Sequence, residues 1–334
     1  MPQRVGHTLI LPSKPSVTGY AAVVGKKEGE GPLAQWFDKI NEDTTLGEAS
    51  WEKAESALVR DALSFALDKS NNPPSNIDYL FAGDLLNQCT GTSFGLRDYN
   101  IPYIGVYGAC STMALTLAQA AIYVDGGAAQ KCAAATSSHF CSAERQFRQP
   151  LEYGGQRPPT SQWTVTGAGA AIVENAGPGP FISSVTIGKM VDYGIKDANN
   201  MGAAMAPAAA DTIKAYFEDT NTAPENYDLI LTGDLARIGS DLLYELLDRE
   251  NINIREKHND CGLMIFDRKK QKVNAGASGC GCAATVLCSY VFEQMRQRNL
   301  KNILFCATGA LMSTTTSQQG ESIPSVAHLL NITI

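Results

Sequence analysis

Apolar residues recur at helical spacing along residues 51–69, and charged residues occupy the opposite side of the same pattern. This pattern predicts an amphipathic helix. Turn residues and two prolines at 70–74 then prevent the helix from continuing. The next residues, 78–85, form an apolar run with the length of a buried strand. The hydrophobic pattern therefore predicts a helix, a loop and a buried strand in that order.

The same order of elements recurs in the second half of the chain. Residues 208–219 have helical spacing, and a loop that contains proline leads from them into the apolar run 228–235. This run, DLILTGDL, is identical to the earlier run, DYLFAGDL, at four of eight positions. Because buried strands also resemble one another by chance, the match alone leaves internal duplication and coincidence both open.

A second set of segments favours the duplication. In each half, a turn of small residues precedes an apolar helix, and a strand follows the helix. The turns are 108–112 and 278–282, the helices 113–124 and 283–296, and the strands 131–136 and 302–308. Buried strands that alternate with helices are typical of an α/β fold with mostly parallel sheets. We expect two duplicated halves, residues 1–180 and 181–334, related by a pseudo-twofold axis, with buried helices in layers.

Composition narrows the function classes. The chain has 334 residues, of which 44% are hydrophobic and 18% charged, as in ordinary globular proteins. A formal net charge of -7 disfavours a nucleic-acid partner. No apolar stretch approaches the roughly 20 residues of a spanning helix. Nine cysteines without a CxxC pair predict reduced thiols in the cytoplasm and no metal site.

Three segments carry weaker signals. The first 49 residues allow only an early strand near 8–11 and a short helix at 33–40. The segment GAGAA at 167–171 lacks the third glycine of a dinucleotide-binding loop and continues into a strand, so we exclude that fold. Arg145, Arg148 and Arg157 could together hold a carboxylate, although a solvated loop is the commoner explanation.

Cys110 is the most informative candidate for chemistry. It lies between a strand-like segment and the predicted helix at 113–124, where free backbone N–H groups and the helix dipole would stabilise a thiolate. A buried structural cysteine is an equally good explanation of its position. The small residues on both sides favour a site.

Four polar residues near the predicted strand ends are further candidates. His139 follows the strand at 131–136, and His258 lies in a polar loop, although a single loop histidine is more often structural. Asp84 and Asp234 end the two repeated strands, where ligands bind in parallel α/β sheets. Either aspartate could be a base, a hydrogen-bond acceptor or a cation ligand, or it could cap the segment that follows.

These features resemble the thiolase and ketoacyl-synthase family. The turn around Cys110, the strand VTGAGAAIV at 165–173 and the turn SGCGCAA at 278–284 carry the resemblance. It implies that a cysteine at the position of Cys110 is acylated, with a histidine and an asparagine or second histidine from the second half. Here the histidine motif is missing, and the last position falls near Cys280. We therefore expect no catalytic residues and a catalytically degenerate relative, with an acyl-transferring enzyme that uses Cys110 as the alternative.

A narrower resemblance covers the whole chain. The segments EGPLAQWFDK, GACSTMAL, ATSSHFCSAERQFRQPLEYGGQRP and KHNDCGLMIF resemble the stage V sporulation protein AD family of endospore-forming bacteria. The resemblance implies binding of dipicolinic acid, pyridine-2,6-dicarboxylate, alone or as its calcium chelate, without another cofactor. It also implies membrane-protein partners of the same sporulation assembly and a cytoplasmic protein held at the spore inner membrane by them. The fold resemblance implies a homodimer.

The expected ligand site combines both sets of candidates. Its residues are Asp84, Cys110, His139, Asp234, His258 and Cys280. The N–H groups near 110–112 and either histidine would donate hydrogen bonds to the carboxylates of dipicolinate. The two aspartates would accept hydrogen bonds from a protonated ligand or complete the shell of chelated calcium. A scaffold for membrane partners is a third function class that the sequence leaves open.

Overall fold

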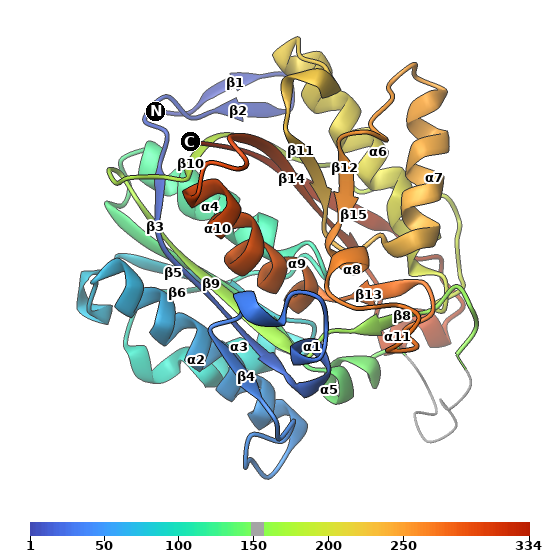
Figure 1. Ribbon diagram of the computed structural model, residues 1–334, viewed down its shortest axis with the longest axis horizontal. Helices are drawn as coiled ribbons and strands as arrows, with labels where there is room; N and C mark the ends of the chain where they lie inside the picture. The colour runs from blue at the N-terminus through green and yellow to red at the C-terminus, as the bar shows by residue number, and fades with distance from the viewer. Residues whose placement is uncertain (148–156) are drawn as a thin grey trace.

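The computed structural model describes residues 1–147 and 157–334 and shows a layered α/β protein (Figure 1). The first half contains one main sheet in the order β6, β5, β7, β9, β3. These strands are β3 (Ser16–Gly25), β5 (Tyr79–Gly83), β6 (Tyr103–Gly105), β7 (Lys131–Ser138) and β9 (Gly167–Glu174). Only β9 runs against the other four, because it pairs antiparallel with both of its neighbours.

The second half repeats this sheet strand for strand. Its order is β12, β11, β14, β15, β10, and here β15 alone runs against the others. The strands are β10 (Phe181–Ile187), β11 (Leu229–Thr232), β12 (His258–Asp260), β14 (Asn302–Ala310) and β15 (Ser325–Thr333). A single pairing between Ser16 and Phe181 joins the two sheets. The predicted duplication with mostly parallel sheets is confirmed, and the division at residue 180 stays a prediction.

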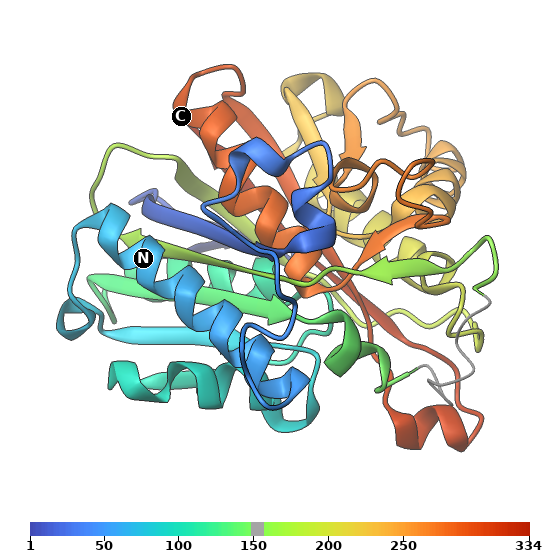
Figure 2. The ribbon, with the colours of Figure 1, turned by 60° about the horizontal axis from the view of Figure 1, so that its bottom comes forward.

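Helices form three layers around the two sheets. The outer helices are α2 (Trp51–Ser70) and α3 (Thr90–Leu96) on the first sheet and α6 (Met201–Thr220) and α7 (Ala236–Asp248) on the second. The central layer holds α4 (Thr112–Asp125), α9 (Cys280–Val286) and α10 (Phe292–Arg296). Figure 2 shows the blue α2 crossing the first sheet on its outer side.

Strand sequences explain the layers. Along β5, Phe81 points into the central layer, whereas Leu80 and Ala82 pack under α2. Along β14, Phe305 enters the central layer, whereas Leu304 faces α6. Successive side chains of a strand point to opposite faces, so a sheet covered on both faces needs a continuous apolar run. The runs in the sequence meet this requirement.

Shorter elements connect and support these layers. They are β1 (Gln3–Val5), β2 (Thr8–Ile10), α1 (Lys26–Gly29), β4 (Lys39–Asn41), α5 (Phe140–Glu144), β8 (Gln162–Thr164), α8 (Cys261–Met264), β13 (Gly276–Ser278) and α11 (Thr314–Gln318). The early strand expected near 8–11 is β2. The helix expected at 33–40 is a single 3-10 turn, Ala34–Trp36, because the chain turns extended at Phe37 and enters β4.

Two other helix boundaries differ from the prediction. α6 begins at Met201, seven residues before the expected start, and carries Pro207 within its length. The alanines and methionines on either side of Pro207 favour the helix and most of them are buried, which outweighs the local cost of the proline. The predicted helix at 283–296 contains a π-helical segment, Leu287–Val291. The segment at 167–171 lies in β9, consistent with our exclusion of a dinucleotide loop.

The central layer should dominate stability. Leu117 of α4 is fully buried in it. We expect Leu117→Ala to lower the free energy of unfolding by about 2–5 kcal/mol, because the substitution leaves a cavity between two rigid sheets. Urea unfolding measures the loss, and Ile187→Ala, at an exposed position, is the control, expected within about 0.5 kcal/mol of the unsubstituted protein. Equal effects of the two substitutions would contradict this assignment of the core.

Candidate functional site

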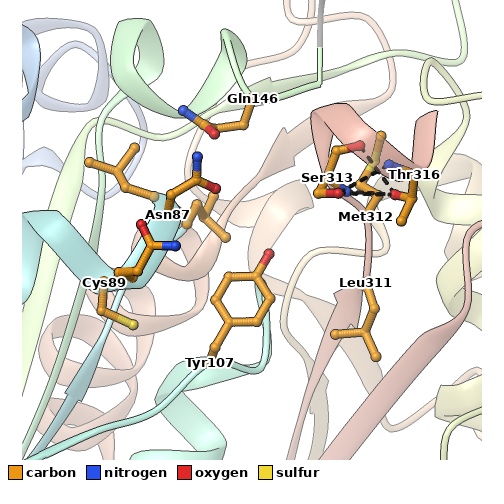
Figure 3. Close-up of a pocket in the computed structure, with 11 residues that line it drawn as sticks. Asn87, Cys89, Tyr107, Gln146, Leu311, Met312, Ser313 and Thr316 are labelled. Atoms are coloured by element: carbon orange, nitrogen blue, oxygen red, sulfur yellow. Dashed lines mark hydrogen bonds between the residues drawn. The ribbon is translucent and has the colours of Figure 1, made fainter. Parts of the chain in front are cut away.

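A pocket of about 380 Å³ opens beyond the carboxyl ends of β5, β6 and β14 (Figure 3). One wall is the loop that follows β5, and the opposite wall is the segment that follows β14. The lining residues are Leu85, Leu86, Asn87, Gln88, Cys89, Tyr107, Gln146, Leu311, Met312, Ser313 and Thr316. Strand ends of an α/β sheet are the usual place for a ligand, so the pocket is the leading candidate site.

Cys110 lies close to this pocket. A smaller cavity of about 30 Å³ has Cys110 in its wall and shares four lining residues with the pocket: Leu85, Tyr107, Gln146 and Met312. The Cys110 side chain is buried, with 5% of the residue exposed. Cys110 therefore lines a small cavity that adjoins the pocket and does not line the pocket itself.

The chain reaches Cys110 through a tight turn. Ala109 adopts a positive φ of 48°, an uncommon conformation for alanine. The Gly108 carbonyl accepts hydrogen bonds from the backbone N–H of Ser111 at 3.0 Å and from its hydroxyl at 2.6 Å. A Cβ at Gly309 would collide with the same carbonyl oxygen, so glycine is required there for the two halves to meet. Sequence and strain together fix Cys110 at the start of α4.

The electrostatic setting of Cys110 differs from our expectation. Burial raises the pKa of its thiol well above the ordinary value, and the nearby negative charge of Asp234 raises it further. A hydrogen bond from the backbone of Gly279 acts in the opposite direction but is outweighed. The prediction that this turn stabilises a thiolate is therefore wrong, because the loss of water costs more than the backbone donors restore.

Asp234 organises the floor from the second half. Its carboxylate accepts hydrogen bonds from the hydroxyl of Thr308 at 2.8 Å, the N–H of Gly279 at 2.9 Å and the hydroxyl of Ser278 at 3.2 Å. It is fully buried, and burial raises its pKa to about 6 despite these donors. Asp234 lines neither cavity, so it acts by positioning Ser278 and the turn after it, and by its charge on Cys110.

Asp84, its counterpart in the first half, holds the pocket wall and does not line the pocket. Its carboxylate accepts hydrogen bonds from the N–H of Leu86 at 2.8 Å and from the N–H of Thr92 at 2.7 Å. These bonds close the loop that carries Asn87 and Gln88 toward the pocket. The alternative that Asp84 caps the segment after its strand is the one that fits the structure.

A second buried acid, Glu55 of α2, lies beside Asp84. Its oxygens accept hydrogen bonds from the hydroxyls of Ser137 and Ser142. Burial raises the pKa of Glu55 to about 8, with a further contribution from the charge of Asp84. Glu55 lies four residues after Trp51 and three before Leu58, so the helical pattern places it on the apolar side of α2. The expectation that the charged residues lie on the opposite side is therefore wrong at Glu55.

Cys280 occupies the turn equivalent to that of Cys110, at the start of α9. Its thiol donates a hydrogen bond to the Ser137 carbonyl at 2.9 Å, and the residue is fully buried outside both cavities. Burial raises the pKa of this thiol well above its ordinary value. Cys280 is close enough to Cys110 to affect the pKa of its thiol. Its own thiol is used in a hydrogen bond within the protein and does not face either cavity.

His139 caps α5 and faces away from the pocket. Its Nδ1 accepts a hydrogen bond from the N–H of Cys141 at 3.1 Å, so the proton lies on Nε2, which donates to the Thr44 carbonyl at 2.8 Å. The ring packs against Trp51 at 5.2 Å between centroids. Burial lowers the pKa of His139, which keeps the ring neutral. The structure does not bring this histidine to Cys110.

His258 is also used structurally. It lies in β12, where we expected a polar loop. Its Nε2 is 2.8 Å from the hydroxyl of Thr232, and its Nδ1 is 2.8 Å from the hydroxyl of Tyr244. Burial lowers the pKa of His258 to about 4. His258 lines neither the pocket nor the smaller cavity, as far as the described residues form them.

Sequence reasoning missed the polar residues that line the pocket. They are Asn87, Gln88, Tyr107, Gln146, Ser313 and Thr316. Their signal is their place in the chain, since several of them follow directly on strands whose ends we had predicted. Ser313 and Thr316 also form a capping box at the start of α11.

The arginine cluster is only partly described. Arg145 forms an ion pair with Glu52 at 3.1 Å, and Arg157 binds Glu144 at 2.6 Å. Arg148 lies outside the described residues. The two arginines that the structure describes therefore already have carboxylate partners within the protein.

Within 1–147 and 157–334, no group of three or more histidine, cysteine or acidic side chains is placed to hold a metal ion. Over the same residues, no helix is long and apolar enough to cross a membrane.

Comparison with known proteins identifies the family. A sequence model for stage V sporulation protein AD matches residues 6–333. The chain belongs to the stage V sporulation protein AD family. It is 48% identical over 313 residues to stage V sporulation protein AD of Bacillus subtilis (strain 168), which covers 93% of this chain and 92% of that protein. Membership in this family supports a role in sporulation.

Solved structures confirm the fold. The chain is similar to 3-oxoacyl-[acyl-carrier-protein] synthase III from Aquifex aeolicus VF5, with a TM-score of 0.59 and 13% identity over 96% of this chain and all of that one. It is similar to a variant of OleA from Xanthomonas campestris, with a TM-score of 0.61 and 14% identity over 96% of this chain and 98% of that one. At such identities the similarity establishes a thiolase-like fold and no activity.

The charge of Asp234 should control the reactivity of Cys110. Above pH about 6 Asp234 is ionised and raises the Cys110 pKa, so Asp234→Asn should lower that pKa and speed alkylation of Cys110 several-fold between pH 7 and 9. Iodoacetamide labelling followed by peptide mass spectrometry measures the rate. Asp228→Asn, at the other end of β11, is the matched control and should leave the rate unchanged. Identical rates in both variants would refute the coupling.

Proposed function

We propose that this family member binds dipicolinic acid, alone or as its calcium chelate, in the pocket above Cys110 and carries out no acyl transfer. The observation that supports the proposal most is the character of the pocket: neutral hydrogen-bonding side chains surround a space above a protonated thiol. A volume of about 380 Å³ falls in the range of about 300–1,000 Å³ that is typical of small-molecule sites.

The lining chemistry suits a planar dicarboxylate. Asn87 and Gln146 each present an amide group, and Figure 3 shows the Tyr107 hydroxyl between them and the α11 segment. Tyr107 is half-exposed, and its partial burial raises its pKa, so its hydroxyl remains a donor at neutral pH. Leu85 and Met312 offer apolar surface for the pyridine ring. Amide and hydroxyl donors would bind the carboxylates of the ligand.

In this proposal, side-chain amide oxygens bind the calcium ion of the chelate, and Asp84 and Asp234 do not. The carboxylates of Asp84 and Asp234 are buried and occupied by protein donors, so neither is placed to complete a calcium shell. Calcium also accepts amide carbonyl oxygens. The side chains of Asn87 and Gln88 supply such oxygens in the pocket wall.

Acyl transfer by Cys110 is the less supported alternative. It needs a thiolate or a base beside the thiol. His139 and His258 both have their ring nitrogens engaged elsewhere, and the Cys110 pKa is raised. The described residues around Cys110 therefore suit a binding cup better than a nucleophilic site.

The proposal extends to the place of the protein in the cell. A dipicolinate-binding protein without chemistry of its own would deliver its ligand to membrane proteins of the same sporulation assembly. We place it in the cytoplasm, held at the spore inner membrane by those partners, where it takes part in uptake or release of dipicolinate.

Calorimetric titration with dipicolinic acid, with and without calcium, tests the proposed ligand. We expect saturable binding that weakens about tenfold or more in Tyr107→Phe and Asn87→Ala, since each loses a hydrogen bond to a charged group worth about 1.5–3 kcal/mol. Tyr193→Phe, at an exposed position away from the pocket, should bind normally. No binding in either condition, or acylation of Cys110 by acetyl-CoA, would overturn the proposal.

We also propose a homodimer that pairs along β6. β6 itself, Tyr103–Gly105, contains neither a charged residue nor a proline, and Tyr103 is 39% exposed. The one proline of its flanks, Pro102, directly precedes the strand. Exposed sheet edges in monomers are usually protected by charges or prolines.

Sedimentation velocity tests the dimer. We expect Tyr103→Lys to shift the protein from dimer to monomer, because it introduces a charge at the centre of the paired edge. Lysine at Tyr193, which is exposed elsewhere, should leave the dimer intact. A monomeric unsubstituted protein at micromolar concentration would exclude the pairing.

A further inference from the structure

A buried ion pair lies behind the wall of the small cavity at Cys110, which shares Gln146 with the pocket. Glu144 is the last residue of α5, and residues on both sides of it, Ala143 and Gln146, line the cavity above Cys110. The N–H of Gln146 bonds to the Ala143 carbonyl at 2.9 Å, and that of Phe147 to the Glu144 carbonyl at 3.2 Å. The position of Glu144 therefore determines where these cavity-lining side chains lie, among them Gln146, which also lines the pocket.

Arg157 fixes Glu144 from the other side. Its guanidinium donates to both carboxylate oxygens of Glu144, at 3.0 and 2.6 Å, and to the Gln162 carbonyl at 3.2 Å. Thr164 of β8, which also lines the cavity, donates its hydroxyl to the same carboxylate at 3.2 Å. The ion pair thus joins two elements that form adjacent parts of the cavity wall, α5 and β8.

Aromatic rings hold the guanidinium in this geometry. Arg157 lies 4.9 Å from the centroid of Phe140 and 4.7 Å from that of Trp163, and these two rings stack at 4.3 Å. The carboxylate of Glu144 has no exposed surface, and the Arg157 side chain is 13% exposed. A guanidinium clamped in this way is neutralised inside the protein and is not placed to bind a ligand carboxylate.

We infer that the buried ion pair between Glu144 and Arg157 positions the cavity wall and so determines how tightly the pocket binds its ligand. The inference rests on the proposed function for the identity of that ligand. A buried ion pair is a weak source of stability, because desolvation offsets its attraction. A bidentate pair does fix side-chain geometry, which is the property that a binding wall needs.

Two readouts on three variants test the inference. The variants are Arg157→Lys, Glu144→Gln and the double variant Glu144→Gln with Arg157→Lys, studied at a temperature at which all are folded. Calorimetry gives the dissociation constant for dipicolinic acid. Labelling with N-ethylmaleimide and peptide mass spectrometry give the alkylation rate of Cys110, which needs no ligand. Asp248→Asn removes a bidentate partner of Arg255 on the surface and is the matched control.

We expect each single variant to bind at least tenfold more weakly and to expose Cys110 to faster alkylation, with the control unchanged. The double variant should bind no more weakly than the single variant with the lower affinity, since the two residues act as one unit. Losses that multiply in the double variant would overturn the inference, as would normal binding in folded single variants. If the unsubstituted protein does not bind dipicolinic acid, the proposed function fails, and the Cys110 rates alone decide whether the pair positions the wall.

Discussion

The burial of α4 and α9 between two sheets is the constraint on which the rest of the structure depends. Ten of the 14 residues of α4 and all seven of α9 are buried. A helix buried in this way must satisfy the N–H groups of its first turn inside the protein. Asp234 does so at Gly279, the N-cap of α9, and at α4 the N–H groups of Ser111 and Thr112 donate to the carbonyls of Gly108 and Ala109. The same packing that stabilises the molecule therefore places two cysteine turns and a buried acid beneath one pocket.

Burial then decides the chemistry of these groups. Asp234 accepts hydrogen bonds from Gly279, Thr308, Ser278 and the Cys110 thiol, all of which favour the carboxylate, and its pKa still rises to about 6. The thiols of Cys110 and Cys280 have fewer compensating contacts, and both remain protonated. Loss of water outweighs hydrogen bonding at every one of these positions. A helix start alone does not make a cysteine reactive when the turn is this deeply enclosed.

The sequence predicted the elements whose burial leaves a regular pattern of apolar residues. The apolar runs of β5 and β11 and the turns before α4 and α9 predicted the duplication, because strands covered on both faces leave a clear pattern. The orientation of the candidate site residues could not be predicted in this way. Asp84 and His139 lie near the pocket in sequence, yet local hydrogen bonds to Thr92 and Thr44 direct them elsewhere. Side-chain direction at a strand end depends on such partners, which no periodicity reveals.

The thiolase-like fold supplies a location and leaves the function to the side chains. In that location this chain has a protonated thiol, neutral amides and a tyrosine hydroxyl. To make Cys110 a nucleophile, a base would have to approach it, and both His139 and His258 would first have to give up hydrogen bonds at each ring nitrogen. Binding would require no such rearrangement, because Asn87, Tyr107 and Gln146 already line the space that a ligand would fill.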